Sequence, residues 1–283
     1  MRLAARLVLL TVPAGCWLVA ANDSAGPKTL PPASEIIAKA VAWAKWHREQ
    51  KFYTQWSFDH VNRVHHLDDA ELVQSHDTRG YRGYPLRGEQ FYEWVLNNGE
   101  PLSPSDLSNE RKRREKFIAQ AVKKAAGEAG EEDGEDEPDF AFNEELVSRY
   151  RSEVVGTEEI DGRTAYVLQF VPKNESLPVR RRMDHALNKS RGRLWIDTGE
   201  FVVLRVEFEL LEPVKLWAGL LGSISRLSGY LALTELGGGA WHYKEAEFRL
   251  KGRVLIKSFH EDRRLEWMNF QPAGEHAPQL DSQ

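Results

Sequence analysis

The sequence predicts a mainly β protein of the α+β class, with one strongly curved antiparallel sheet of roughly nine to eleven strands and two or three helices on one face. Short segments in which apolar and polar residues alternate recur along the chain, and this period of two is typical of half-buried strands. Turn signals separate them, among them the pair Asp161-Gly162. No internal repeat and no clear linker divides the chain into folded halves.

The segment from Arg191 to Leu211 shows the pattern most clearly. A polar turn at residues 197–200 separates two apolar runs, which indicates a hairpin. After the turn, mostly charged residues alternate with apolar ones, which are Val202, Leu204, Val206, Phe208 and Leu210. A lone hairpin is only marginally stable in water, so this one must pair with further strands and bury its apolar face.

Residues 1–21 are predicted to be an export signal. Arg2 and Arg6 precede an apolar run from Leu7 to Ala20, which is short for a membrane span. Small residues then lead to a predicted cleavage site between Ala21 and Asn22. We therefore expect an exported, periplasmic protein.

Cys16 is the only cysteine, and it lies inside this signal. The preceding Pro13-Ala14-Gly15 is similar to a lipoprotein cleavage box, so a lipid anchor on Cys16 is the alternative prediction. If cleavage follows Ala21, the mature chain has no cysteine and its core must hold the fold without a disulfide.

Behind the signal we expect a flexible leader at residues 22–33, one folded domain at 34–270 and a frayed tail at 271–283. An acidic run at residues 127–139 interrupts the domain and predicts a solvated, disordered loop. The formal net charge of −5 argues against nucleic acid as the main partner.

Three helices are expected. Residues 34–47 carry a broad apolar stripe that includes Trp43. At Ser103, a capping residue precedes Pro104 and the reciprocal carboxylate of Asp106, which predicts a helix start. Residues 216–227 have apolar side chains at helical spacing, and we interpret them as a glycine-hinged cover over an apolar cavity. An ordinary buried helix is the alternative for this last segment.

Signals for enzymatic chemistry are weak. The chain shows no glycine-rich phosphate loop, nucleophile elbow or paired-histidine zinc helix, and no polar constellation that indicates a hydrolase. His60, His65, His66 and His76 lie close in sequence, but neighbours in a strand point to opposite faces, so we expect no shared metal site. The prediction is a non-enzymatic protein without a cofactor.

Two segments carry a family resemblance. EVVGTEEIDGRTAYVLQFVPK, from Glu153, and GRLWIDTGEFVVLRVEFEL, from Gly192, resemble the outer-membrane lipoprotein-sorting proteins, the LolA/LolB-like carriers. The shared features are a DG-x-x-x-Y-x-L hairpin, an LWID strand, a turn, and a strand rich in Val, Arg and Glu. The acidic run and the long second helix, with YRGYPLRGEQFYEW before it, look like a divergent bacterial branch of this group.

The resemblance implies a half-open barrel whose concave face is covered by helices and whose cavity receives lipoprotein acyl chains, other lipids or similar apolar cargo in the periplasm. The alternative that it implies is an envelope sensor or interaction module that binds a regulatory protein. The residues expected to line the cavity and its lid are Trp43, Trp56, Phe58, Tyr166, Leu168, Phe170, Leu204, Val206, Phe208, Trp217, Leu220, Leu221 and Ile224.

Overall fold

The computed structural model describes residues 30–127, 142–173, 177–181, 183–216, 222–255 and 257–274. The chain divides into two units, Met1–Leu30 and Pro31–Gln283, and every element below lies in the second. The predicted signal with Cys16, Ala21 and Asn22, and the predicted acidic loop after residue 127, lie outside the described residues.

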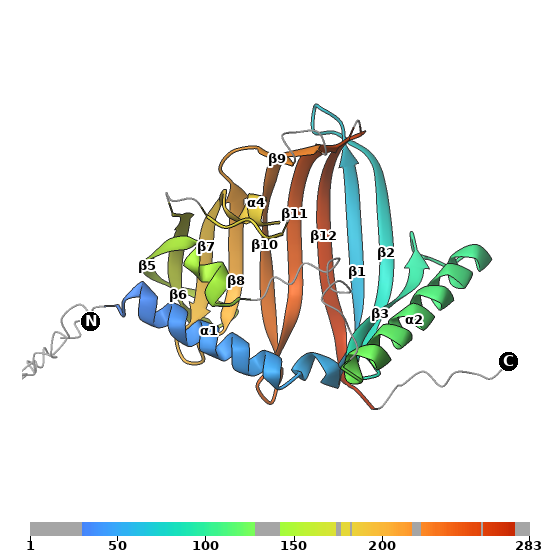
Figure 1. Ribbon diagram of the computed structural model, residues 1–283, viewed down its shortest axis with the longest axis horizontal. Helices are drawn as coiled ribbons and strands as arrows, with labels where there is room; N and C mark the ends of the chain where they lie inside the picture. The colour runs from blue at the N-terminus through green and yellow to red at the C-terminus, as the bar shows by residue number, and fades with distance from the viewer. Residues whose placement is uncertain are drawn as a thin grey trace, which may run out of the picture. The chain divides into compact units, whose positions relative to one another are not determined.

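The described residues form one open antiparallel sheet of twelve strands, which confirms the mainly β, α+β class (Figure 1). The strand order is β4-β3-β2-β1-β12-β11-β10-β8-β7-β6-β5, with β9 paired to β10 off this path. The strands are β1 (Trp56–Leu67), β2 (Val73–Leu86), β3 (Glu89–Asn97), β4 (Glu100–Pro101), β5 (Tyr150–Ile160), β6 (Arg163–Pro172), β7 (Ser190–Asp197), β8 (Val203–Leu210), β9 (Val214–Leu216), β10 (Gly222–Gly237), β11 (Ala240–Val254) and β12 (Lys257–Pro272).

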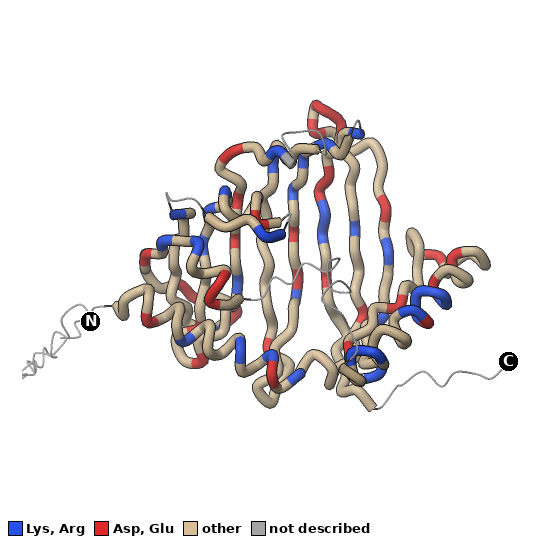
Figure 2. The backbone as a smooth tube through the Cα atoms, in the orientation of Figure 1, with Lys and Arg blue, Asp and Glu red and all other residues tan. Residues whose placement is uncertain are grey.

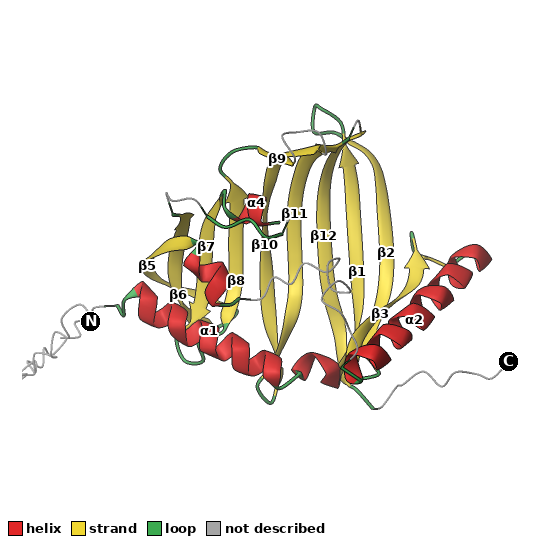
Figure 3. Ribbon diagram, viewed as in Figure 1, coloured by secondary structure: helices red, strands yellow, loops and turns green. Residues whose placement is uncertain are grey.

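Four α-helices and one short 3₁₀ helix accompany the sheet in the described part of the chain (Figure 3). They are α1 (Ala33–Glu49), η1 (Phe52–Gln55), α2 (Pro104–Ala125), α3 (Glu144–Ser148) and α4 (Asp184–Leu187). Helices α1 and α3 contact β5, at one end of the strand order, whereas α2 contacts β3 near the other end. Helix α1 also reaches the central strand β11 through His47 and Trp241, and η1 contacts β11, β2 and β3.

Helix α1 is held at both ends. Its buried side chains Ile36 and Ala40 pack against the sheet residues Leu168, Phe170, Leu194 and Ile196. In its last turn, Nε2 of His47 accepts a hydrogen bond of 3.0 Å from the backbone N–H of Trp241. This bond satisfies a donor at the start of β11 and fixes where the helix ends on the sheet.

Helix α2 begins as predicted and covers the edge of β3. Ser103 accepts a hydrogen bond from the backbone N–H of Asp106 at 3.2 Å. On β3, Glu110 accepts from the backbone N–H of Trp94 at 3.1 Å, and Arg113 donates to the carbonyl of Tyr92. Two side chains of α2 thus supply the partners that a further strand would supply, which protects the edge from pairing with another chain.

The helix predicted over residues 216–227 is wrong in the part that the structure describes. Gly222–Gly237 form β10, which pairs with β8, β9 and β11. The apolar residues there follow a period of two from Leu227 to Leu233, apart from bulges, and Gly229 lowers helix propensity. Trp217, Leu220 and Leu221 lie outside the described residues.

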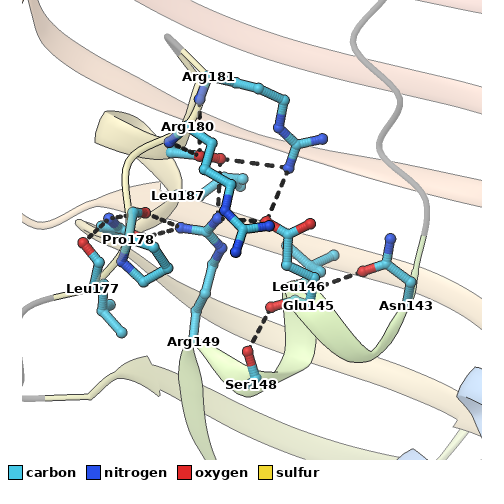
Figure 4. Close-up of polar contacts among 12 residues, drawn as sticks. Asn143, Glu145, Leu146, Ser148, Arg149, Leu177, Pro178, Arg180, Arg181 and Leu187 are labelled. Carbon is cyan, nitrogen blue, oxygen red and sulfur yellow. Dashed lines mark hydrogen bonds and ion pairs between the residues drawn. The ribbon is translucent and has the colours of Figure 1, made fainter. Parts of the chain in front are cut away.

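A buried ionic cluster joins α3, β5 and α4 (Figure 4). Arg149 pairs with Asp184 at 3.1 Å and with Glu145 at 3.0 Å, and it donates to the carbonyl of Pro178 at 2.9 Å. The side chains of Arg149 and Asp184 are only 1% and 0% exposed. We call this group the Arg149 clasp.

Asp184 stays ionised in this site although it is buried. Desolvation raises the pKa of its carboxyl, but the backbone N–H groups of Arg180 and Arg181 and the charge of Arg149 lower it more, so the pKa lies below its ordinary value. The clasp is therefore a compensated pair of buried charges, which makes the loss of one partner expensive.

We expect Arg149→Met to lower the free energy of unfolding by about 3–5 kcal/mol, because it leaves the buried carboxylate of Asp184 with only the half-exposed Arg181, 3.4 Å away, as a cation. Arg191→Met is the matched control, since its pair with Glu209 is half exposed on both sides and such pairs contribute at most ~1 kcal/mol. Urea denaturation measures both. Equal, small losses would contradict the role of the clasp.

Candidate functional site

Residues that lie directly opposite each other in paired strands share one face of a sheet. We call the face that carries Leu168 and Leu194, and against which α1 packs, the inner face, and the other the outer face. Two rows of directly paired residues cross the inner face from β6 to β2, and no bulge interrupts the pairing along either row.

The first row alternates phenylalanine and glycine across five neighbouring strands. Phe170 lies opposite Gly192, Gly192 opposite Phe208, Phe208 opposite Gly229, and Gly229 opposite Phe248. A Cβ atom at Gly192 would meet the ring of Phe170 at 2.7 Å. The rings of Phe208 and Phe248 are 6.1 Å apart across Gly229. The glycines therefore leave room in which the aromatic rings lie close to the sheet.

The second row is aliphatic, and it runs through Leu168, Leu194, Val206, Leu231, Ala246 and Leu265. Leu168 and Leu194 are buried in the core under α1, whereas Val206, Leu231 and Leu265 are partly exposed. We call the part of the two rows on β8, β10, β11 and β12 the apolar floor, and it consists of Val206, Phe208, Leu231, Ala246, Phe248 and Leu265.

The outer face of the same strands is charged. Arg264 lies 3.2–3.8 Å from Glu245, Glu247 and Glu266, and Arg205 pairs with Glu207 at 2.9 Å. Figure 2 shows charged positions spaced between uncharged ones along these central strands. A face with so many charged side chains is expected to contact water. The apolar surface of these strands is therefore on the inner face.

A hollow of about 490 Å³ does not coincide with the apolar floor. Most of its side-chain lining belongs to the outer face and includes Arg191, Arg193, Glu207 and Glu209. The ion pair between Arg191 and Glu209 fits water or a polar ligand better than an acyl chain. On the apolar floor, Ala246 is buried, and the partly exposed side chains are Val206, Phe208, Leu231, Phe248 and Leu265.

The structure brings part of the predicted site together. Tyr166, Leu168, Phe170, Val206 and Phe208 all belong to the inner-face core or pack against it. These residues come from the two hairpins whose alternation the sequence showed.

Other predicted site residues lie elsewhere. Leu204 joins a second cluster with Trp195 and Trp241, because a bulge between Trp195 and Ile196 shifts the register of β8. Trp43 packs edge-on against Trp241, with ring centroids 6.4 Å apart, beside this same cluster. Neither side chain contributes to the apolar floor.

The three remaining residues of the predicted site that the structure describes lie near the ends of their strands. Trp56 begins β1 opposite Pro272, and Ile224 lies opposite Gly252 near the start of β10. Phe58 is buried, and its ring occupies the position that a Cβ atom at Gly83 would take.

Most of the apolar floor was missed at the sequence level. Leu231, Ala246, Phe248 and Leu265 follow a period of two in β10, β11 and β12. For Leu231, the signal was hidden because the segment before it was interpreted as a helix.

Two buried histidines belong to an aromatic cluster beside the floor. His60 stacks on Trp267 with ring centroids 4.6 Å apart, and His242 lies 4.4 Å from Phe58. Each histidine Nδ1 donates to a backbone carbonyl, that of Glu266 for His60 and that of Tyr243 for His242. Burial lowers the pKa of both to about 4, so both rings are neutral at pH 7.

Among the described residues, no group of three or more His, Cys, Asp or Glu side chains is placed to hold a metal ion. No helix in the described ranges is both long enough and apolar enough to cross a membrane.

No protein-family model and no curated protein matches the sequence. Among solved structures, the chain is similar to a domain named for outer-membrane lipoprotein sorting from Vibrio parahaemolyticus, at 10% identity and a TM-score of 0.36, over 86% of this chain and 95% of that one. It is also similar to a LolA superfamily protein from Nitrosomonas europaea, at 12% identity and a TM-score of 0.33, over 86% of this chain and 94% of that one.

A chain of the Pseudomonas aeruginosa MucA/MucB complex is similar at 10% identity and a TM-score of 0.22, over 83% of this chain and 99% of that one. Lipoprotein-sorting structures are thus among those that the chain is similar to, as the resemblance of its two hairpins led us to expect. At these identities and TM-scores the likeness by itself assigns no function to this chain.

We expect the protein to lose stability on mild acidification. The folded pKa values of His60 and His242 lie below the unfolded value of 6.5, so the unfolded chain binds more protons. The stability that the two neutral histidines contribute is fully present above pH 6.5 and is lost as the pH falls towards 4. At pH 5 the free energy of unfolding is lower by ~2 kcal/mol per histidine. Urea denaturation at pH 7 and pH 5 measures the difference.

His242→Phe should remove about half of this fall, because Phe carries no titrating group. His76→Phe is the control, since its ring is already exposed to water in the folded chain. A free energy of unfolding that stays equal at both pH values would contradict the expectation.

Proposed function

We propose that this chain is an exported, non-enzymatic protein that binds the acyl chain of a lipid or lipoprotein on the inner face of its sheet. The observation that supports the proposal is the apolar floor, a continuous, partly exposed surface on strands whose other face is covered with ion pairs. An amphipathic sheet of this kind needs an apolar occupant on one side. The predicted export signal supports a periplasmic location for this function.

The size of the hydrophobic effect sets how tightly such a floor can hold its cargo. A chain of about a dozen methylenes gains ~10 kcal/mol when it is fully buried, at about 0.8 kcal/mol each. A floor covers the chain from one side only, so about half of this gain remains, which corresponds to a dissociation constant somewhat below millimolar. Binding in that range is reversible, and a carrier must release its cargo.

The six side chains of the floor suit an acyl chain better than a polar ligand. Val206, Leu231 and Leu265 offer branched aliphatic contacts, and Phe208 and Phe248 offer flat rings beside Gly229. None of these side chains carries a polar atom that would select a sugar or a peptide backbone. We infer that specificity for the tail is low and that chain length determines affinity.

A direct test uses a fluorescent fatty acid as the probe. Leu231→Gln and Phe248→Gln place an amide on the floor, and each should weaken binding about tenfold, since ~1.4 kcal/mol of apolar contact is lost. Arg249→Gln is the matched control, because Arg249 follows Phe248 on the same strand but lies on the outer face. Fluorescence titration measures the affinity, and thermal melting confirms that each variant is folded.

Absence of probe binding to the wild-type protein would contradict the proposal. Equal effects of Phe248→Gln and Arg249→Gln would contradict the placement of the site on the inner face.

The second candidate function is an interaction module that docks an envelope protein through α2. The observation that favours it is the surface of that helix, which exposes Leu107 and Val122 and also carries exposed basic residues such as Lys112 and Lys116. A partner of this kind would carry acidic side chains around an apolar patch. In that case the inner-face variants would keep full binding of the partner.

A further inference from the structure

The most exposed large hydrophobic side chains of the described chain gather at one end of the sheet. They are Leu72 and Val73, where β1 turns into β2, and Val254 and Leu255, where β11 turns into β12. Each is 56–63% exposed, and no other large hydrophobic side chain that the structure describes exceeds 53%. We call these four residues the aliphatic tip, and Figure 1 shows both turns at the upper end of the sheet.

Ion pairs join the first of these turns to the strands that lead to the second. Asp69, between β1 and β2, pairs with Lys251 of β11 at 3.1 Å. Glu71 of the same turn reaches further, to Arg226 of β10 at 2.7 Å. Both partners lie on strands beyond β12 in the strand order. The four aliphatic residues therefore belong to one structured end of the sheet.

Leu255 adopts a backbone conformation that leucine disfavours. Its φ angle is 53°, in the left-handed region that glycine and asparagine adopt most readily. A glycine or asparagine would fold there at lower cost and would expose less apolar surface. The leucine gains little burial in return, since it is 59% exposed. A strained, exposed leucine of this kind indicates a role outside the fold itself.

The surroundings of the aliphatic tip are basic, although the chain as a whole is acidic. The strand ends and turns beside it carry five basic side chains and three carboxylates, which are Lys215, Arg226, Lys251, Arg253 and Lys257, and Asp68, Asp69 and Glu71. The formal net charge of the whole chain is −5. The excess of positive charge is therefore a local property of this end.

The three carboxylates already have partners within the protein. Asp69 and Glu71 form the ion pairs described above, and the carboxylate of Asp68 accepts from the backbone N–H of Leu72 at 2.9 Å. By contrast, Lys215 and Lys257 are exposed, and neither pairs with a carboxylate in the described part of the chain. The positive charge of these two lysines is thus available to an anionic partner.

An anionic lipid surface fits the aliphatic tip better than a protein does. The energetic centres of protein interfaces are rich in Trp, Tyr and Arg, whereas Leu and Val are under-represented there. A bilayer takes up aliphatic side chains at its boundary, while its anionic headgroups attract basic residues around them. Two turns at the end of a sheet can also meet a flat surface without a groove.

We propose that the aliphatic tip docks the protein end-on to the surface of a bilayer that contains anionic lipids. The four aliphatic side chains enter the boundary between headgroups and acyl chains, and Lys215 and Lys257 lie beside the phosphates. This inference goes beyond the proposed acyl binding on the apolar floor and does not depend on it, because it assigns a function to a different surface.

The test measures co-sedimentation of residues 22–283, which lack the predicted signal, with lipid vesicles. All described elements belong to the unit Pro31–Gln283, so this chain keeps them. We expect it to bind vesicles of phosphatidylglycerol and phosphatidylethanolamine. Binding to vesicles of phosphatidylcholine alone should be about tenfold weaker, because the lysines then meet no net negative charge.

Leu255→Asn separates docking from folding. It removes an aliphatic side chain and places at this φ angle a residue that tolerates it. We expect binding to the anionic vesicles to weaken about tenfold, the usual effect of losing one buried aliphatic side chain. The melting temperature should equal or exceed that of the wild type. Leu72→Asn should weaken binding to a similar extent.

Val155→Asn is the matched control for the aliphatic residues. Val155 is 53% exposed on β5, at the far end of the strand order, and its loss should leave vesicle binding unchanged. The charges have a control of their own. Replacing Lys215 and Lys257 together by Gln should weaken binding to anionic vesicles about tenfold, whereas the same replacement of Lys112 and Lys116 on α2 should not.

Leu231→Gln distinguishes this inference from the proposed function, since it should weaken fatty-acid binding and leave vesicle binding intact. Absence of wild-type binding to anionic vesicles would overturn the inference and would leave a protein as the partner of the aliphatic tip. Equal losses in Leu255→Asn and Val155→Asn, or full binding by both Leu255→Asn and Leu72→Asn, would also overturn it.

Discussion

The register between the central strands is the constraint on which the other features of this protein depend. Gly229 lies between Phe208 on one side and Phe248 on the other, and the same register places Leu231 between Val206 and Ala246. A slip of one residue would turn the whole apolar set to the outer face and the charged residues to the inner one. The ion pairs of Arg264 and Arg205 on the outer face oppose such a slip, because their charged partners would then lie among the apolar side chains of the inner face.

Helices pack against both ends of this sheet, and α1 extends from β5 to Trp241 on the central strand β11. At one end α1 buries Leu168 and Leu194, with His47 and the Arg149 clasp fixing the elements around it. At the other end α2 satisfies the edge of β3 through Glu110 and Arg113. Five of the six side chains of the apolar floor stay partly exposed beside these contacts, whereas Ala246 is buried. This arrangement connects the stability of the fold with the availability of the proposed site.

Local signals made part of this structure predictable. Two hairpins were predictable from their turns, at Asp161-Gly162 and after Asp197, and the start of α2 was predictable from Ser103 and Pro104. Each of these signals depends on a few neighbouring residues. The segment 216–227 was misinterpreted because its apolar residues also fit a helical period, and its partners on β11, from Leu250 to Val254, lie beyond the next turn of the chain. The floor depends on pairings between strands such as that of Ala246 with Leu265, which no local pattern specifies. Leu204 was misplaced by a bulge that likewise has no local signature.

The most direct test of the central claim is a crystal structure of the protein with a fatty acid whose tail carries bromine atoms, located by their anomalous scattering. The account predicts bromine positions over Phe208, Leu231 and Phe248 on the inner face. Bromine in the hollow lined by Arg191 and Glu209, or no ordered bromine in a crystal grown with saturating ligand, would contradict it.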